Sequence, residues 1–179
     1  MMVRTSNERF ALAVLTVLVL DQASKLLVLN NLGYAHERVI WDGFFKFVHW
    51  GNTGAAWSLF RDNNGLLTII SLVVSAALMM GRKKFAPPTP AGDYTMGMVL
   101  GGIVGNTVDR LAHGHVVDFL YFYLRRRSGD ELGFPAFNVA DSAICVGVFL
   151  LLLYSVSAGN DGEAARKTVT GENERQASG

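Results

Sequence analysis

Asp118 and Asp141 are two carboxylates set in short, mostly apolar stretches, VVDFL and FNVAD. An ionisable group in a membrane-like setting costs free energy, so each is a candidate functional residue. If the fold brings the two together, both cannot ionise cheaply and they share one proton near neutral pH. One carboxylate can then take a proton from water while the other polarises a carbonyl, which is the chemistry of aspartic proteases. The alternative is two unrelated acids at helix ends.

The surroundings of Asp141 predict how the proton would be shared. Asn138 precedes Asp141 by about one helical turn and is a typical N-cap residue. Asp141 would then lie in the first turn of a helix, where the helix dipole favours a carboxylate. We therefore interpret Asp141 as the ionised base and Asp118 as the protonated partner.

Other polar residues lie within or at the ends of apolar segments. Asp21 and Lys25 are four residues apart and share one helix face, which predicts an ion pair that orients the helix. Asn106, Asp109 and Arg110 close a glycine-rich apolar stretch. We interpret this second group as a polar patch that orients other side chains.

The same stretch carries Gly97, Gly101 and Gly105, one glycine every four residues. This spacing places small residues along one helix face and allows a second membrane helix to approach closely. We therefore expect these glycines to serve packing.

Four apolar segments must position these residues, so we expect an all-α membrane protein with transmembrane helices at about residues 10–29, 64–81, 94–111 and 139–157. A spanning helix needs about 20 mostly apolar residues, so the second segment needs its polar flanks or a thin bilayer. The first segment has an alternative interpretation as a cleavable signal peptide, although no clear cleavage site follows it.

The linker between the first two helices, about residues 36–62, is expected to fold outside the membrane. An Asp42-Gly43 turn signal within aromatic and β-branched sequence predicts a short hairpin. Asn52 and Gly54 predict a turn or a loop that hydrogen-bonds a peptide backbone. Residues 55–60 are expected to form a short interfacial helix. The polar tail, residues 159–179, is predicted to be disordered.

Composition narrows the classes of function. Hydrophobic residues make up 50% of the chain, and the net charge of +1 gives no reason to expect a nucleic acid partner. Cys145 is alone, so no internal disulfide forms. The four histidines lack the spacing of a metal site. The basic cluster at residues 82–84 favours cytoplasmic termini.

Five motifs in chain order resemble those of the bacterial lipoprotein signal peptidase family, also called signal peptidase II. They are DQASK at 21–25, NTGAA at 52–56, GGIVGNTVDR at 101–110, VDF at 117–119 and FNVAD at 137–141. The resemblance implies an aspartic endopeptidase of the bacterial cytoplasmic (inner) membrane. It also implies four transmembrane helices, cytoplasmic termini, an outer β-cradle at about 36–62 and a short periplasmic helix. Residues 1–158 would be one peptidase domain with the active site near the outer face, followed by a cytoplasmic tail.

The activity implied by the resemblance is removal of signal peptides from prolipoproteins, with cleavage just before the diacylglyceryl-modified lipobox cysteine. No metal or organic cofactor is expected; membrane lipids and globomycin-type inhibitors are expected ligands. Asp118 and Asp141 match the catalytic aspartates. The supporting and substrate-contacting positions match Asp21, Lys25, Asn52, Gly54, Asn106, Asp109, Arg110, Asn138 and Ala140.

Two other functions remain open from the residues alone. A small proton-coupled transporter would use its acids as a relay across the bilayer. A membrane protein that binds signal peptides without cutting them would not need both acids. One departure from the family is the charged stretch that begins at Arg125-Arg126-Arg127, which is longer than expected and either binds anionic headgroups or is solvated.

Overall fold

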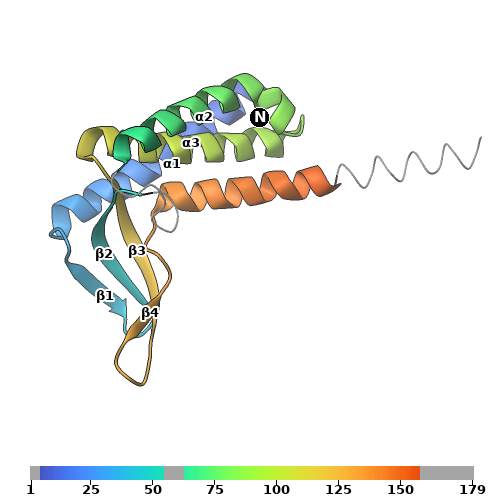
Figure 1. The fold of residues 1–179 in the computed structure, drawn as a ribbon. Coiled ribbons are helices and arrows are strands. Elements are labelled where there is room, and N and C mark those ends of the chain that lie inside the picture. Colours follow the sequence, from blue (N-terminus) through green and yellow to red (C-terminus); the bar gives the residue numbers. More distant parts are fainter. Residues whose placement is uncertain (1–4, 55–62, 158–179) are drawn as a thin grey trace, which may run out of the picture.

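The structure, a computed structural model, describes residues 5–54 and 63–157. The interfacial helix expected at 55–60 and the tail at 159–179 therefore lie outside the described residues. Figure 1 shows long helices running side by side, with a small sheet at one end of them. We call this end the sheet end.

The helices are α1 (Ser6–Asn31), α2 (Asn64–Phe85), α3 (Pro90–His113) and a C-terminal helix, Val139–Ser157, drawn in orange in Figure 1. α1 and α3 end at the sheet end, whereas α2 and the C-terminal helix begin there. The chain therefore enters or leaves the sheet at all four of these helix ends. Residues far apart in the sequence can meet there.

Local sequence explains where two of these helices begin. Thr5 and Glu8 form a reciprocal capping box at the start of α1. Thr89 caps α3, and Pro90 occupies the first turn, where a missing N–H costs nothing. Gly114 then ends α3 with φ 76°, a left-handed conformation that glycine adopts without strain.

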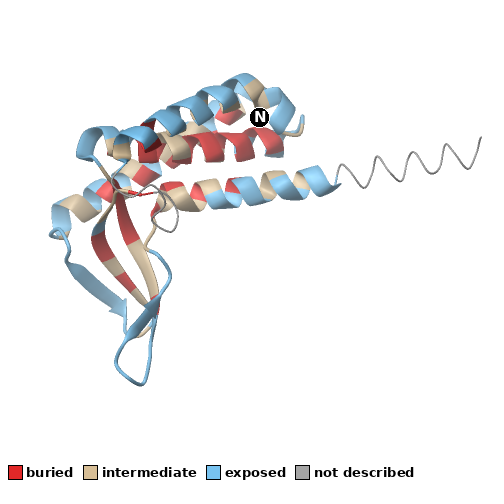
Figure 2. Cartoon of the chain, viewed as in Figure 1, coloured by how far each residue is buried: buried red, intermediate tan, exposed pale blue. Residues whose placement is uncertain are grey.

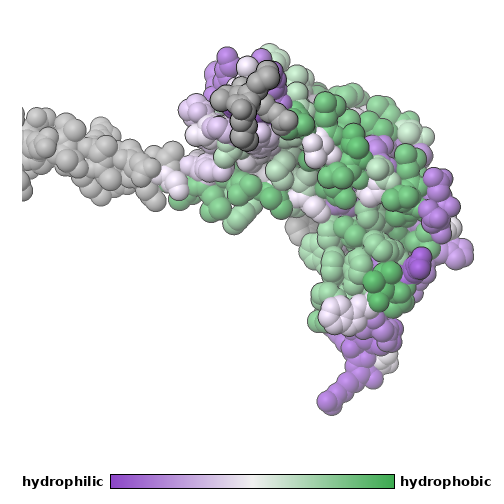
Figure 3. Space-filling view, turned by 180° about the vertical axis from the view of Figure 1, so that it is seen from behind, coloured by the Kyte–Doolittle hydropathy of each residue, from purple (hydrophilic) through white to green (hydrophobic). Residues whose placement is uncertain are grey.

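Three of the described helices are long and apolar enough to cross a membrane: α1, α2 and the C-terminal helix. Their surfaces expose many large apolar side chains, such as Leu27, Ile69 and Leu152, and Figure 3 shows apolar residues covering much of one face. The structure is therefore that of an integral membrane protein. α3 does not reach the same apolar measure, so its transmembrane status stays a prediction.

α3 is the most buried helix, as the red ribbon in Figure 2 shows. It packs against both α1 and α2. A Cβ atom added to Gly97 would lie 2.6 Å from Phe10 O of α1, and one added to Gly102 would lie 2.5 Å from Ala140 O of the C-terminal helix. These contacts need glycine because the backbones nearly touch. Gly97 thus has the packing role that its spacing predicts.

The sheet has four antiparallel strands in the order β1 (Glu37–Trp41), β2 (Phe45–Asn52), β3 (Val116–Arg125) and β4 (Glu131–Gly133). The predicted hairpin is the β1–β2 pair. β1 and β2 lie within the range of about 36–62 expected for the β-cradle, and β3 and β4 come from the stretch after α3, where the sequence predicted no strand. β3 is the longest strand and carries Asp118.

The pairing of β2 with β3 brings Asn52 close to Asp118, which is far from it in the sequence. In the β2–β3 register, Asn52 lies opposite Val116 and Trp50 lies opposite Asp118. A single bridge between Leu120 and Phe137 then leads the chain from the sheet into the C-terminal helix. The sheet thus holds Asp118 beside the first turn of that helix.

We expect Gly97→Ala to destabilise the protein, because the new methyl group would overlap α1. Overpacking of this kind costs about 1–3 kcal/mol. Gly65→Ala is the matched control: its added Cβ would meet no atom of the described residues within 4 Å, and alanine in a helix gains up to about 1 kcal/mol over glycine. Thermal unfolding of both variants in detergent tests this. Equal stability of the two variants would contradict the close approach of α1 and α3.

Candidate active site

Asp118 and Asp141 meet at Asn138. The Asn138 side-chain amide donates to Asp118 Oδ1 at 2.9 Å, and its backbone N–H donates to Asp141 Oδ2 at 3.3 Å. The Asn138 carbonyl Oδ1 in turn accepts from the backbone N–H of Asp141 at 2.8 Å, so the predicted N-cap is present. One capping residue therefore contacts both carboxylates.

Two further asparagines complete the hydrogen bonds of the pair. Asn52 Nδ2 donates to Asp118 Oδ2 at 2.9 Å, and Asn106 Nδ2 donates to Asp141 Oδ1 at 2.7 Å. Gly54 N donates to Asn52 Oδ1 at 2.9 Å, which holds that amide in place. Each of the four carboxylate oxygens thus accepts an N–H hydrogen bond.

A buried ion cluster lies next to the pair. Lys25 Nζ is 2.7 Å from Asp21 Oδ2 and 2.7 Å from Asp109 Oδ2, and all three side chains are buried. The third donor of the ammonium group reaches Asn106 Oδ1 at 3.1 Å. The cluster therefore connects α1 and α3 and touches the asparagine that contacts Asp141.

The two acids of this cluster also hold the elements that carry the pair. Asp21 Oδ1 accepts from Ala140 N at 2.9 Å, at the start of the C-terminal helix. Asp109 Oδ2 accepts from Val117 N at 3.1 Å, beside Asp118 on β3. The cluster is thus hydrogen-bonded to the neighbours of both carboxylates.

Arg110 and Gln22 extend the network. Arg110 Nη2 donates to Gly54 O at 3.2 Å and so holds the turn that carries Asn52. Gln22 Nε2 donates to Asp109 Oδ1 at 2.9 Å and to Gly105 O at 3.2 Å. We did not predict Gln22, although it stands next to Asp21 in the first motif. The sequence signal that could have identified Gln22 is its position between two charged residues, Asp21 and Lys25, in an apolar helix.

The structure brings all the predicted site residues into one connected network. It comprises the two aspartates Asp118 and Asp141 and their predicted supports Asp21, Lys25, Asn52, Gly54, Asn106, Asp109, Arg110, Asn138 and Ala140. Their roles in a reaction stay predictions.

The environment of Asp118 favours its protonated form. Burial raises the pKa of this carboxyl to about 7, and the negative charge of Asp141 acts in the same direction. Hydrogen bonds from Asn52 and Asn138 and the charge of Lys25 oppose the rise. Asp118 is therefore suited to hold a proton near neutral pH.

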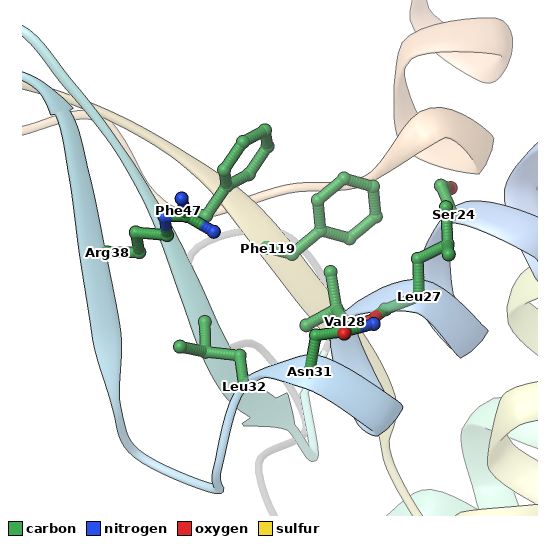
Figure 4. A pocket seen from close by; sticks show the side chains of 8 residues that line it. All are labelled: Ser24, Leu27, Val28, Asn31, Leu32, Arg38, Phe47 and Phe119. Carbon is green, nitrogen blue, oxygen red and sulfur yellow. The ribbon is translucent and has the colours of Figure 1, made fainter.

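A mostly apolar cavity of about 330 Å³ lies between the last turns of α1 and the sheet. Leu27 and Val28 line it from α1, and Phe47 and Phe119 line it from β2 and β3, as Figure 4 shows; Arg38 reaches it from β1. Phe119 follows Asp118 directly in β3. The cavity and the carboxylate pair thus share β3 as a common element.

Two solved structures, both of bacterial membrane enzymes, share this fold. One has a TM-score of 0.74 and 25% sequence identity, covering 85% of this chain and 90% of its own; the other has a TM-score of 0.68 and 26% identity, covering 82% and 91%. The fold is thus that of a bacterial membrane enzyme. The model of the signal peptidase (SPase) II family matches residues 13–157, and the chain belongs to this peptidase family.

Curated relatives agree with this membership and with the resemblance of the five motifs. The lipoprotein signal peptidase of Neisseria meningitidis serogroup C is 38% identical, over 89% of this chain and 96% of that protein. Those of Tolumonas auensis and Pseudomonas putida are each 41% identical, over 75% and 78% of this chain and 82% and 81% of their own lengths.

We expect Lys25→Met to destabilise the fold severely, because Asp21 and Asp109 would stay buried without their cation. Breaking a buried ion pair from one side costs about 3–5 kcal/mol. Arg125→Met is the control, since its ion pair with Asp42 is exposed and such pairs contribute about 0–1 kcal/mol. Chemical denaturation in detergent measures both. A Lys25→Met variant as stable as the control would show that the cluster is dispensable.

Proposed function

We propose that this protein is an aspartic endopeptidase that removes the signal peptide from prolipoproteins. It cuts the peptide bond just before the diacylglyceryl-modified cysteine. The observation that supports the mechanism is that the carboxylates of Asp118 and Asp141 accept hydrogen bonds from the side-chain amide and the backbone N–H of the same residue, Asn138. Membership of the signal peptidase II family supports the substrate class.

In the proposed reaction, Asp141 is ionised and Asp118 is protonated. Asp141 takes a proton from a water molecule, whose oxygen attacks the scissile carbonyl carbon. Asp118 donates a hydrogen bond to the carbonyl oxygen and stabilises the negative charge that develops there. The tetrahedral intermediate then collapses, and a proton passes to the leaving amine nitrogen. No covalent enzyme intermediate and no metal take part.

The three asparagines would act by positioning. Asn52, Asn106 and Asn138 offer only N–H donors to the carboxylates, so they hold both side chains without removing a proton from either. Two oxygens held in place in this way can face one water molecule and one carbonyl. Because the donors sit on three different elements, the geometry needs the complete fold.

The proposal places the protein in the bacterial cytoplasmic (inner) membrane with four spanning helices, α3 included. The basic cluster of Arg82, Lys83 and Lys84 occupies the last turn of α2, at the opposite end from the carboxylates. Positive residues favour the cytoplasmic side. Both termini would then be cytoplasmic and the active site near the outer face. Residues 1–158 would form one peptidase domain, with membrane lipids and globomycin-type inhibitors as further ligands.

A proton-coupled transporter fits the arrangement less well. Its ionisable groups would form a relay across the bilayer. Here Asp21, Asp109, Asp118 and Asp141 belong to a single hydrogen-bonded network at the sheet end. This grouping favours chemistry at one depth over transport.

Substituting either aspartate should slow cleavage severely. Asp118→Asn and Asp141→Asn remove the acid or the base while keeping the side-chain shape, and loss of such a group slows catalysis by about 10²- to 10⁴-fold. A gel-shift assay with a lipidated prolipoprotein measures the rate. Asp42→Asn, in the exposed ion pair, is the control. A normal rate in either dyad variant would refute the mechanism, and uncut but bound substrate with the wild type would indicate a non-catalytic binder.

The reaction should slow as the pH rises above about 7. The active form needs a proton on Asp118, and that carboxyl loses its proton as the pH passes its pKa of about 7. Values of kcat/KM measured over roughly pH 5 to pH 9 should therefore fall on the basic side. Circular dichroism over the same range controls for unfolding. A constant rate above neutrality would show that Asp118 is not the acid.

A further inference from the structure

We propose that Asn106 is a positioning residue that carries the influence of the Lys25 charge to Asp141 and so makes Asp141 the ionised member of the pair. This inference rests on the proposed aspartic mechanism. It gives a structural reason why Asp141, and not Asp118, carries the negative charge in that mechanism. The buried chain of hydrogen bonds from Lys25 through Asn106 to Asp141 carries it.

The orientation of the Asn106 amide follows from its partners. Its Oδ1 lies 3.1 Å from Lys25 Nζ and 3.3 Å from Asn138 Nδ2, both of which are donors without an acceptor function. Only the carbonyl oxygen can face them, so the NH₂ group must point the other way. It points to Asp141 Oδ1 at 2.7 Å. Lys25 thereby keeps a donor aimed at Asp141.

Lys25 itself has no freedom to leave this arrangement. An ammonium group has three N–H donors, and here they match three acceptors, on Asp21, Asp109 and Asn106. The Lys25 side chain is 2% exposed. The cation therefore polarises the Asn106 amide permanently, which strengthens the hydrogen bond that the amide donates to a carboxylate.

Within the part of the chain that the structure describes, Asp118 lacks an equivalent chain of hydrogen bonds. Its donors are Asn52 and Asn138, whose carbonyl oxygens accept from the backbone N–H groups of Gly54 and Asp141. Neutral backbone groups thus support the amides at Asp118, whereas an ammonium supports the amide at Asp141. This difference favours negative charge on Asp141.

The other charged groups near Asp141 act in both directions: the negative charge of Asp21 opposes ionisation of Asp141, whereas the positive charge of Arg110 favours ionisation of both Asp141 and Asp118. Around it lie Lys25 and Asp21 from α1, Asp109 and Arg110 from α3, and Asp118 from β3. The two acids other than Asp118 are occupied by Lys25 and by backbone N–H groups. Within this set, Lys25 is the cation that reaches Asp141 through a single amide.

The test replaces Asn106 and measures the pH dependence of kcat and KM with a lipidated prolipoprotein. Asn106→Leu removes the donor, so kcat should fall about 10- to 100-fold, as for loss of a hydrogen bond to a charged group. KM should change little. The acid limb of the pH profile should move to higher pH, by about one unit, because ionised Asp141 has lost its donor.

Asn106→Asp is the second variant, and it preserves the shape of the side chain and the acceptor for Lys25. It places an oxygen against Asp141 where the NH₂ group was, so the acid limb should again move to higher pH. If Asn106→Leu fails to fold, the pH profile of Asn106→Asp alone tests the role of Asn106. Thr107→Val is the matched control: Thr107 is equally buried, but its hydroxyl donates only to Ile103 O within α3.

The inference is overturned if folded Asn106 variants keep the wild-type acid limb, or if Thr107→Val moves it equally. That result is distinct from failure of the proposed mechanism. If Asp118→Asn and Asp141→Asn are inactive while the Asn106 variants keep the wild-type limb, the aspartic mechanism stands and only the role of Asn106 is wrong.

Discussion

A buried ammonium group must find an acceptor for each of its three N–H donors, because no water can replace a missing one. Lys25 meets this requirement with Asp21, Asp109 and Asn106. Asp21 and Asp109 also accept hydrogen bonds from backbone N–H groups at the start of the C-terminal helix and in β3, respectively. One buried charge thus dictates how four elements meet. Its cost is offset only when all of these partners are in place.

The packing of α3 follows from the same need. Backbone groups of neighbouring helices must come close enough for short side chains such as Asp21 and Asn106 to span the gap. Gly102 and Gly105 allow this, since an added Cβ would lie 2.5 Å from Ala140 O or 2.6 Å from Asp21 Oδ2. A membrane helix that serves this purpose carries glycine and polar residues on its faces. α3 is consequently not among the three described helices that are apolar enough to span a membrane, and it is the most buried of the described helices.

The sheet supplies one of the two carboxylates and one of its hydrogen-bond donors. β3 carries Asp118, and Asn52 reaches it from the neighbouring strand. The pair is therefore assembled from a strand and a helix start, each with its own electrostatic environment. In the proposed mechanism, the raised pKa of Asp118 favours a proton on that carboxyl, while the helix start and the amide polarised by Lys25 would favour charge on Asp141. Two identical functional groups would then take different roles because their surroundings differ.

The sequence by itself determined the features that depend on local chemistry. Apolar segments predicted the helices, Asn138 predicted the N-cap of the last one, and five motifs predicted the family. The tertiary structure alone decided the features that depend on partners distant in the chain. β3 and β4 escaped prediction because a strand is defined by its neighbour, and β2 lies far from β3 in sequence. The orientation of Asn106 likewise depends on Lys25 of another helix, since an isolated amide has no preferred direction.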